Sequence, residues 1–270
     1  MLGGEDFRER ISRVPVSLGS SGFDPFGMDP DWVTTTLPAV AFLHRKYFRT
    51  EVFGVENLPQ GRVLLVANHS GQIPLDGVLI GATLFMDVDP PRFCRAMVEK
   101  WSQTLPFVST FFARMGQVVG NPENAERLLQ NEEALLVFPE GVRGISKTFD
   151  RRYQLEDFGL GFMRLALATK TPIVPVAVIG GEEQYISIGN ASKIAKTLRL
   201  PSLPIIPQLF FPGGQLPLPT RYRLHFGEAM TFEGDSDDED GVVGEKVAVV
   251  KATLQSMVNR GLKERKAVFW

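Results

Sequence analysis

Apolar residues gather into three short runs along the middle of the chain, at 63–67, 134–138 and 172–179. Each run is followed by polar residues or glycine. Continuous apolar runs of this length are typical of strands buried on both faces, as in a parallel sheet covered by helices. Pro175 lies inside the third run, where it indicates an edge strand or an end of pairing.

Segments with helical spacing or shorter apolar patches lie between these runs. The pattern predicts helices after Asp76, over 121–131 and over about 158–170, and strands at 51–55, 92–98, 118–119 and 221–227. It also predicts an aromatic helix or helix pair within 101–115 around Pro106, and a helix with a basic end within 182–200. The chain is therefore expected to form an α/β fold with a mixed, largely parallel central sheet flanked by helices.

The two ends of the chain have a different character. Residues 1–28 are rich in Gly, Ser and charge, which predicts a mobile arm with little regular structure. An amphipathic helix with a basic end is predicted from Asp31, and it belongs either to the core or to a membrane surface. The predicted α/β domain, with this helix, covers 29–234. An acidic linker at 235–241 and an amphipathic helix with a basic tail at 242–270 follow.

The segment 201–219 is apolar and aromatic, and its prolines exclude a helix. Exposing a long uncharged loop is unfavourable. Two interpretations remain open, since such a loop either packs internally or contacts lipid or substrate.

Overall charge and composition narrow the class of protein. The formal net charge of −2, from 29 Lys plus Arg and 31 Asp plus Glu, gives no basis for a nucleic-acid partner. The single cysteine, Cys94, rules out an internal disulfide and fits a reducing compartment. The first residues lack the basic start and apolar run of a secretory signal. The three histidines show no metal-ligand spacing, so no metal is expected.

Candidate chemistry lies where the apolar runs end. Asn68 and His69 follow the first run, and Asp76 opens the next helix. This places a histidine where an α/β sheet usually carries its ligand crevice. His69 is either a proton acceptor for a bound hydroxyl, with a carboxylate holding its tautomer, or a structural histidine near a helix-capping Asp.

A second set of polar residues follows the run at 134–138. Glu140 and Gly141 come first, and a cluster of four cations, Arg143, Lys147, Arg151 and Arg152, comes next. Such a cluster is either a solvated surface or an anion site, and its place after a buried strand favours binding of a phosphate group.

Read together, these motifs resemble those of the glycerolipid acyltransferases related to 1-acylglycerol-3-phosphate acyltransferase. The order is Asn68-His69 with Asp76, a region around Gly116, Phe138-Pro139-Glu140-Gly141, and Ile173-Val174-Pro175-Val176, over roughly residues 50–230. The family usually places four residues between His and Asp, which would put the acid at Pro74. The family arginine near Gly116 has no clear counterpart, and Arg114 precedes the glycine.

The resemblance implies roles for these residues. His69 would remove the proton of an acceptor hydroxyl as it attacks an acyl thioester, and Asp76 would steady the imidazolium. Backbone N–H groups at Ser70 and Gly71 would receive the oxyanion. The predicted substrate-binding residues also include Asn68, Glu140, Gly141, Arg143 and Lys147, with Arg143 and Lys147 pairing with a phosphate.

The leading hypothesis is an O-acyltransferase that uses acyl-CoA or acyl-ACP as co-substrate, without a cofactor, and acts on a lysophospholipid or other glycerolipid. The expected location is the cytoplasm, peripheral on the cytoplasmic face of a membrane, so that a membrane surface is an expected partner. Three alternatives remain: transfer to diacylglycerol or a long-chain alcohol, a non-catalytic lipid-binding protein on the same fold, and a hydrolase that uses the same dyad on water.

Overall fold

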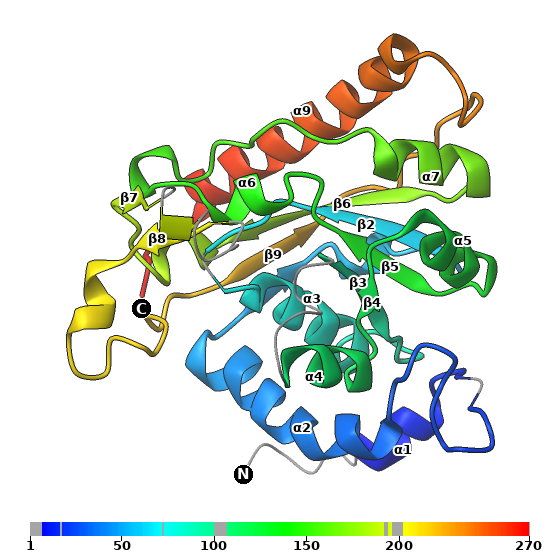
Figure 1. Cartoon of the computed structure of the whole chain (residues 1–270), viewed down its shortest axis with the longest axis horizontal. Helices are drawn as coiled ribbons and strands as arrows, with labels where there is room; N and C mark the ends of the chain where they lie inside the picture. The colour runs from blue at the N-terminus through cyan, green and yellow to red at the C-terminus, as the bar shows by residue number, and fades with distance from the viewer. Residues whose placement is uncertain are drawn as a thin grey trace.

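The computed structural model describes residues 7–16, 18–71, 73–99, 107–191, 194–195 and 202–269. At its centre lies a seven-stranded sheet with the order β1-β9-β6-β2-β5-β3-β4 (Figure 1). Every neighbouring pair is parallel except β6 and β9, which are antiparallel. The predicted class, a mixed and largely parallel sheet, is confirmed. The strands are β1 (Glu51–Phe53), β2 (Val63–Ala67), β3 (Cys94–Val98), β4 (Val118–Val119), β5 (Ala134–Val137), β6 (Ile173–Ile179) and β9 (Arg223–Phe226).

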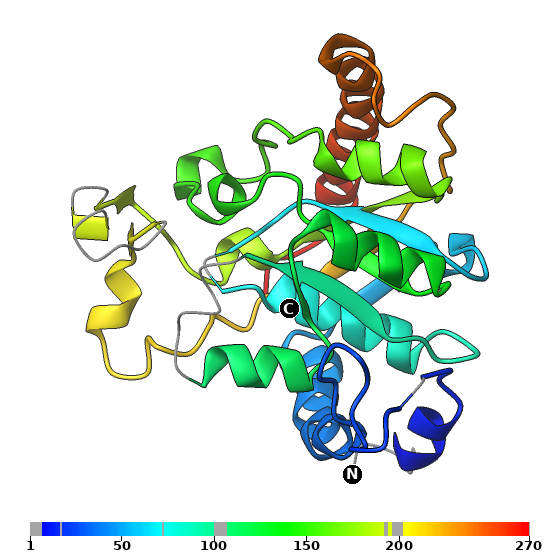
Figure 2. The same ribbon diagram turned by 45° about the vertical axis from the view of Figure 1, so that its right-hand side comes forward.

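Helices cover both faces of this sheet (Figures 1 and 2). One side carries α1 (Phe7–Ser12), α2 (Pro30–Phe42), α3 (Leu75–Met86) and α4 (Val108–Arg114). The other carries α5 (Pro122–Gln130), α7 (Gly161–Thr169) and α9 (Asp240–Glu264). Shorter elements are the π-helix η1 (Leu43–Tyr47), the helix α6 (Val142–Ile145), the 3-10 helices η2 (Val55–Asn57), η4 (Phe149–Arg151), η5 (Gly181–Glu183) and η6 (Pro207–Phe210), and a two-stranded sheet of β7 (Gly189–Asn190) and β8 (Pro204–Ile205).

Strand β2 shows why its sequence is uniformly apolar. Successive side chains point to opposite faces of a sheet. Val63, Leu65 and Ala67 join the cluster that contains α3, whereas Leu64 and Val66 join the cluster formed with α5, α7 and α9. All five residues are fully buried, so the strand carries its C-terminal turn on a rigid, doubly covered support.

Strand β6 is not at the edge of the sheet, so that interpretation of Pro175 is wrong. The alternative, an end of pairing, agrees with the structure. The regular ladder with β9 stops at the pair Val176 and Phe226, and Pro175 uses its carbonyl to accept the Gly227 N–H at 2.9 Å. The missing N–H of the proline therefore lies where the regular ladder has already ended.

The N-terminal arm was expected to have little regular structure, but it contains α1 and is tied to the sheet. Asp24 Oδ2 lies 2.6 Å from Arg95 Nη2 on β3, and both side chains are almost fully buried. Helix α2 begins at Pro30 rather than at Asp31, because the Asp29 side chain accepts the N–H groups of Asp31 and Trp32 and caps the helix.

Helix α9 begins at Asp240, two residues before the predicted start, and packs along β6. Its buried side chains include Val243, Val250, Leu254 and Val258. Among the residues that the structure describes, no helix has the length and apolar composition needed to cross a membrane.

The apolar segment 201–219 was expected either to pack internally or to contact lipid or substrate, and much of it is exposed. Together, β7, β8 and η6 form a projection that we call the β7–β8 lobe, with described residues 186–191, 194–195 and 202–216. Most of its large apolar side chains are exposed, including Phe210 and Phe211, whereas Ile206 is buried. Most of the basic end of the helix predicted within 182–200 lies outside the described residues, as does the first part of the aromatic stretch, 101–106.

Candidate active site

The turn after β2 is held to the neighbouring strand by Asn68. Its Oδ1 accepts the Val178 N–H at 2.7 Å and its Nδ2 donates to the Val178 carbonyl at 2.9 Å. These two bonds continue the pairing of β2 with β6 beyond the last backbone pair. Asn68 is buried and positions the turn, and its predicted contact with substrate stays a prediction.

His69 and Asp76 come together across the turn. The distance between His69 Nδ1 and Asp76 Oδ2 is 2.8 Å. Asp76 lies in the first turn of α3, where the helix dipole favours a negative charge. Its carboxylate also accepts the N–H groups of Ser70 and Gly77, each at 2.8 Å. The acid is thus completely buried yet hydrogen-bonded at both oxygens.

The His69 ring is fixed in orientation as well as in position. It stacks on Phe138 with a centroid distance of 4.1 Å and an interplanar angle of 19°. Phe138 follows β5, so the base and the surface beneath it come from two adjacent parallel strands. With Nδ1 bonded to the carboxylate, Nε2 is the ring nitrogen left to face a substrate.

A cluster of buried charged residues holds the backbone of the turn that carries His69. Glu140 Oε1 accepts the His69 N–H at 3.0 Å, and Glu140 Oε2 accepts the Glu156 N–H at 2.8 Å. Lys147 Nζ lies 3.4 Å from Glu140 Oε2 and 2.8 Å from Glu182 Oε1. We call Glu140, Lys147 and Glu182 the buried charge cluster.

The titration of this cluster reflects its surroundings. Burial lowers the pKa of Lys147, but the attraction of Glu182 and Glu140 outweighs it and leaves that pKa above its usual value. Burial raises the pKa of Glu182 above its usual value, against the attraction of Lys147. Glu140 and Lys147 are paired inside the protein, which gives both a structural role, and their contact with substrate stays a prediction.

The predicted oxyanion donors also need revision. The Ser70 N–H is directed at Asp76, so it is not available to a substrate oxygen. Gly71 has φ of 72° and packs so tightly that a Cβ there would lie 2.0 Å from Gln184 Nε2. Its role as an oxyanion donor stays a prediction. Gly141 donates its N–H to the Phe138 carbonyl at 2.9 Å and precedes α6, and its contact with substrate likewise stays a prediction.

Several positioning residues were missed in the sequence. Gly144 on α6 packs against the turn, and a Cβ there would lie 2.8 Å from His69 Cβ. Glu182 and Gln184 follow β6, and Gln184 Nε2 donates to the Ile73 carbonyl at 3.1 Å. The available signal was the polar stretch Gly180–Gly181–Glu182–Glu183–Gln184 directly after a buried strand.

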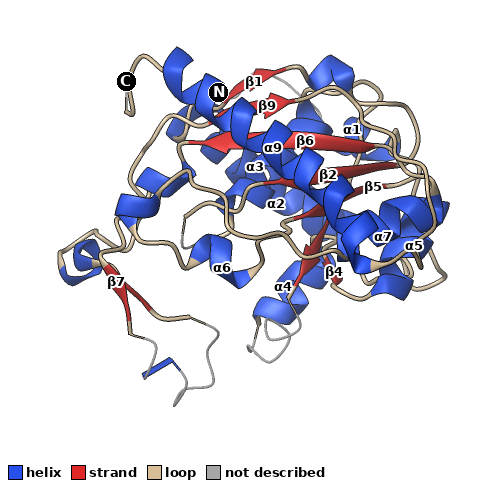
Figure 3. Cartoon of the chain, turned by 90° about the horizontal axis from the view of Figure 1, so that it is seen from above, coloured by secondary structure: helices blue, strands red, loops and turns tan. Residues whose placement is uncertain are grey.

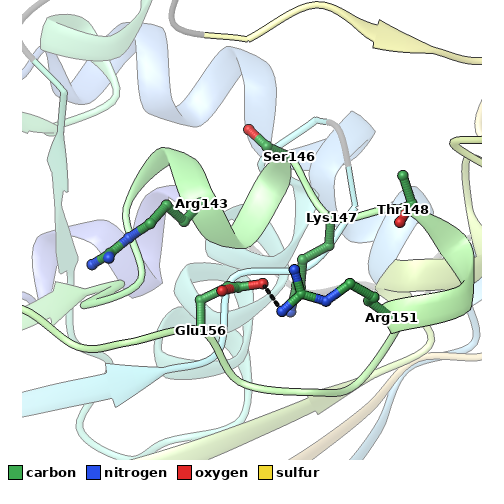
Figure 4. Close-up of a pocket in the computed structure, with 6 residues that line it drawn as sticks. All are labelled: Arg143, Ser146, Lys147, Thr148, Arg151 and Glu156. Carbon is green, nitrogen blue, oxygen red and sulfur yellow. Dashed lines mark ion pairs between the residues drawn. The ribbon is translucent and has the colours of Figure 1, made fainter. Parts of the chain in front are cut away.

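An open pocket of about 300 Å³ lies beside α6, and Figure 4 shows the residues that line it. Arg151 pairs with Glu156 at 2.9 Å, whereas Arg143 points away from them. Arg143 is exposed and donates to the Asp157 carbonyl at 2.8 Å. The lining residues are Arg143, Ser146, Lys147, Thr148, Arg151 and Glu156.

Comparison with known proteins agrees with this geometry. A model of the Acyltransferase family matches residues 49–179, which contain the turn, Phe138, Glu140 and all of β6. An uncharacterized protein of Mycobacterium tuberculosis is 36% identical over 260 residues, which cover 93% of this chain and 73% of that protein.

Two further relatives have functional names. A chicken (Gallus gallus) DGAT1/2-independent enzyme synthesizing storage lipids is 25% identical over 213 residues, 79% of this chain and 60% of that protein. A probable 1-acyl-sn-glycerol-3-phosphate acyltransferase of Mycoplasma pneumoniae is 29% identical over 147 residues, 52% of each chain.

A solved structure shares the fold. The 1-acyl-sn-glycerophosphate acyltransferase PlsC of Thermotoga maritima superposes with a TM-score of 0.53 at 20% identity, covering 87% of this chain and 82% of that one. The family match, the extent of the mycobacterial relative and the shared fold lead to one conclusion. The chain belongs to the acyltransferase family related to the 1-acylglycerol-3-phosphate acyltransferases, and it is an acyltransferase enzyme.

Proposed function

We propose that the enzyme transfers a fatty acyl group from an acyl thioester to a hydroxyl group of a lysophospholipid or another glycerolipid, with His69 as the general base. One observation carries the proposal. His69 is fixed at the carboxyl end of β2 by Asp76 on Nδ1 and by Glu140 on its backbone N–H, which leaves Nε2 to accept a proton.

The reaction needs no covalent bond to the protein. The acceptor oxygen attacks the thioester carbonyl carbon while Nε2 of His69 takes the hydroxyl proton. The resulting tetrahedral oxyanion collapses, the C–S bond breaks and the thiolate leaves. His69 then returns its proton to the sulfur, which yields the ester and a free thiol. Asp76 stabilises the imidazolium that exists between these two transfers.

The donor class is proposed to be acyl-CoA or acyl-ACP. Both carry phosphate, and many glycerolipid acceptors do too. The pocket beside α6 is lined by Arg143, Ser146 and Thr148, and α6 packs on the His69 turn through Gly144. Arginine suits phosphate through charge and paired N–H groups. Arg143 is thus the proposed phosphate contact.

A second acceptor class is transfer to diacylglycerol or a long-chain alcohol. Two observations support this second acceptor class. Lys147 is used inside the protein rather than on a phosphate, and the chicken relative is named as an enzyme of storage-lipid synthesis.

The decisive experiment incubates the purified protein with labelled acyl-CoA and either lysophosphatidic acid or diacylglycerol, and follows label in the lipid product. We expect His69→Ala to lower turnover by about 10²–10⁴-fold, the usual contribution of a general base. His225→Gln is the matched control, because it replaces a histidine on β9 that stacks on Phe53, outside the turn.

The outcomes separate the hypotheses. Label in neither lipid, for wild type as well as variant, would overturn the transferase proposal and favour a lipid-binding protein. Labelled free fatty acid without lipid product would indicate a hydrolase. Equal turnover for wild type and His69→Ala would exclude His69 as the base.

A further inference from the structure

The β7–β8 lobe exposes large apolar side chains that the core does not use. Phe210 is 84% exposed and Phe211 65%, and Ile188, Ile205, Leu209 and Leu216 add to the same projection. Single apolar residues scattered over a surface are ordinary, but several large ones exposed on one projection indicate a contact with another apolar phase.

The charge of this stretch is one-sided. From Gln184 to Gly227 the sequence contains no Asp or Glu. Its cations include Lys193, Lys196 and Arg199, which lie outside the described residues. Exposed apolar side chains in a stretch of sequence whose charged residues are all cations match the boundary between the headgroups and acyl chains of an anionic bilayer.

The lobe is attached directly to the turn that carries His69. Gln184 is buried and links them, since its Nε2 donates to the Ile73 carbonyl and its own carbonyl accepts from Gln208 Nε2 at 3.2 Å. Tyr185 also donates through its hydroxyl to the Gln215 carbonyl at 2.7 Å. In Figure 3 the lobe lies on the side toward which the β6 arrow points. Because β2 is parallel to β6, the turn after β2 lies at the same end of the strands.

We propose that the β7–β8 lobe inserts Phe210, Phe211 and their neighbours into the surface of an anionic lipid bilayer, and so holds the His69 turn against the phase that contains its lipid substrates. The role given to this docking, which is to bring the site to its lipid substrates, rests on the proposed function. The insertion of the lobe into a bilayer does not depend on that function. The irregular, turn-rich shape of the lobe favours lipid over a second copy, because a deformable bilayer accepts a projection that a flat protein face does not.

The test measures sedimentation of the full chain with vesicles of phosphatidylcholine alone and of phosphatidylcholine with phosphatidylglycerol. Wild type is expected to bind the anionic vesicles more tightly, and added salt should weaken binding. The variant Phe210→Ser/Phe211→Ser should lower the vesicle partition coefficient at least tenfold, because it removes two exposed rings and alters no core contact. The matched control is Val242→Ser/Val249→Ser, which alters two exposed apolar residues on α9.

Two further measurements distinguish a failure of the lobe proposal from a failure of the proposed function. Turnover on short-chain acyl-CoA and a short-chain acceptor, both dissolved as monomers, should be unchanged in the Phe variant. Loss of vesicle binding by the variant without any turnover by wild type would retain the lobe proposal and overturn the proposed function. Undiminished vesicle binding by the Phe variant, or none by wild type, would overturn the lobe proposal. So would a wild-type dimer in lipid-free ultracentrifugation that the Phe variant dissociates, because it would assign the lobe to a second copy.

Discussion

At the scale of the single residue, Asp76 shows how hydrogen bonds allow a carboxylate to be buried next to a histidine. A carboxylate is costly to bury unless its oxygens are hydrogen-bonded. Asp76 receives two backbone N–H groups and the His69 ring, and it lies at the start of α3. The acid is therefore hydrogen-bonded and fixed in place before any substrate arrives, and it is positioned to stabilise a proton on His69.

Replacing Asp76 by Asn should lower turnover while preserving shape. A hydrogen bond to a charged group contributes about 1.5–3 kcal/mol, so we expect turnover to fall roughly ten- to a hundredfold, less than for His69→Ala. The pH dependence of turnover should also change, because the imidazolium loses its partner. The measurement is a pH profile of acyl transfer. An unaltered profile would show that Asp76 does not act on His69.

At the scale of the element, the buried charge cluster joins three loops that follow β5, α6 and β6. Glu140 holds the backbone of His69, Lys147 holds Glu140, and Glu182 completes the pairing from η5. Each loop alone is short and irregular. The charges fix their relative positions, since removing one partner leaves an uncompensated buried charge.

Lys147→Met should therefore destabilise the fold by about 3–5 kcal/mol at pH 8. The loss should be smaller at pH 5. Lys147 is charged at both values, since its pKa is raised and its contribution is lost only above its unfolded pKa of 10.5. Without it, the already raised pKa of Glu182 rises further, so the folded state gains a proton and stability as pH falls.

Chemical denaturation at the two pH values measures this effect, with the exposed Lys263→Met as the control. Equal destabilisation by Lys147→Met at both pH values would contradict the raised pKa assigned to Glu182.

The sequence predicted most elements of the sheet but not the contacts between its loops. Apolar runs reveal strands because burial on both faces excludes polar residues, as in β2. The order of strands and the partner of Lys147 depend on residues far apart in the chain. A cluster of cations after a buried strand suggested phosphate, yet Lys147 is turned inward by Glu182, which lies 35 positions later in the sequence (182 minus 147). Arg143, from the same cluster, is exposed.

At the scale of the whole molecule, the N-terminal segment is part of the folded body. Arg95 on β3 is almost fully buried, and it contacts Asp24 Oδ2 and Glu133 Oε2, each at 2.6 Å. Asp24 also accepts the N–H groups of Phe26 and Met28. A Gly- and Ser-rich composition indicated a loose arm, because composition does not show that one buried arginine needs an acid from that arm.

Asp24→Asn should lower the free energy of unfolding by about 3 kcal/mol, because it removes one of the two carboxylates that compensate a buried guanidinium. Denaturant titration of the full chain provides the measurement. Asp237→Asn, an exposed residue before α9, should change stability by less than about 0.5 kcal/mol. A variant at position 24 as stable as wild type would place the N-terminal segment outside the cooperative unit.

The turn between His69 and Asp76 has a consequence for finding related enzymes. Asp76 is positioned by the first turn of α3 and His69 by the end of β2, so the residues between them can differ in number while the two side chains still meet at 2.8 Å. A search that demands four residues between the histidine and the acid would pass over this chain. Genome surveys that score the strand end and the helix start separately, with a variable gap, should recover acyltransferases that fixed-length patterns discard.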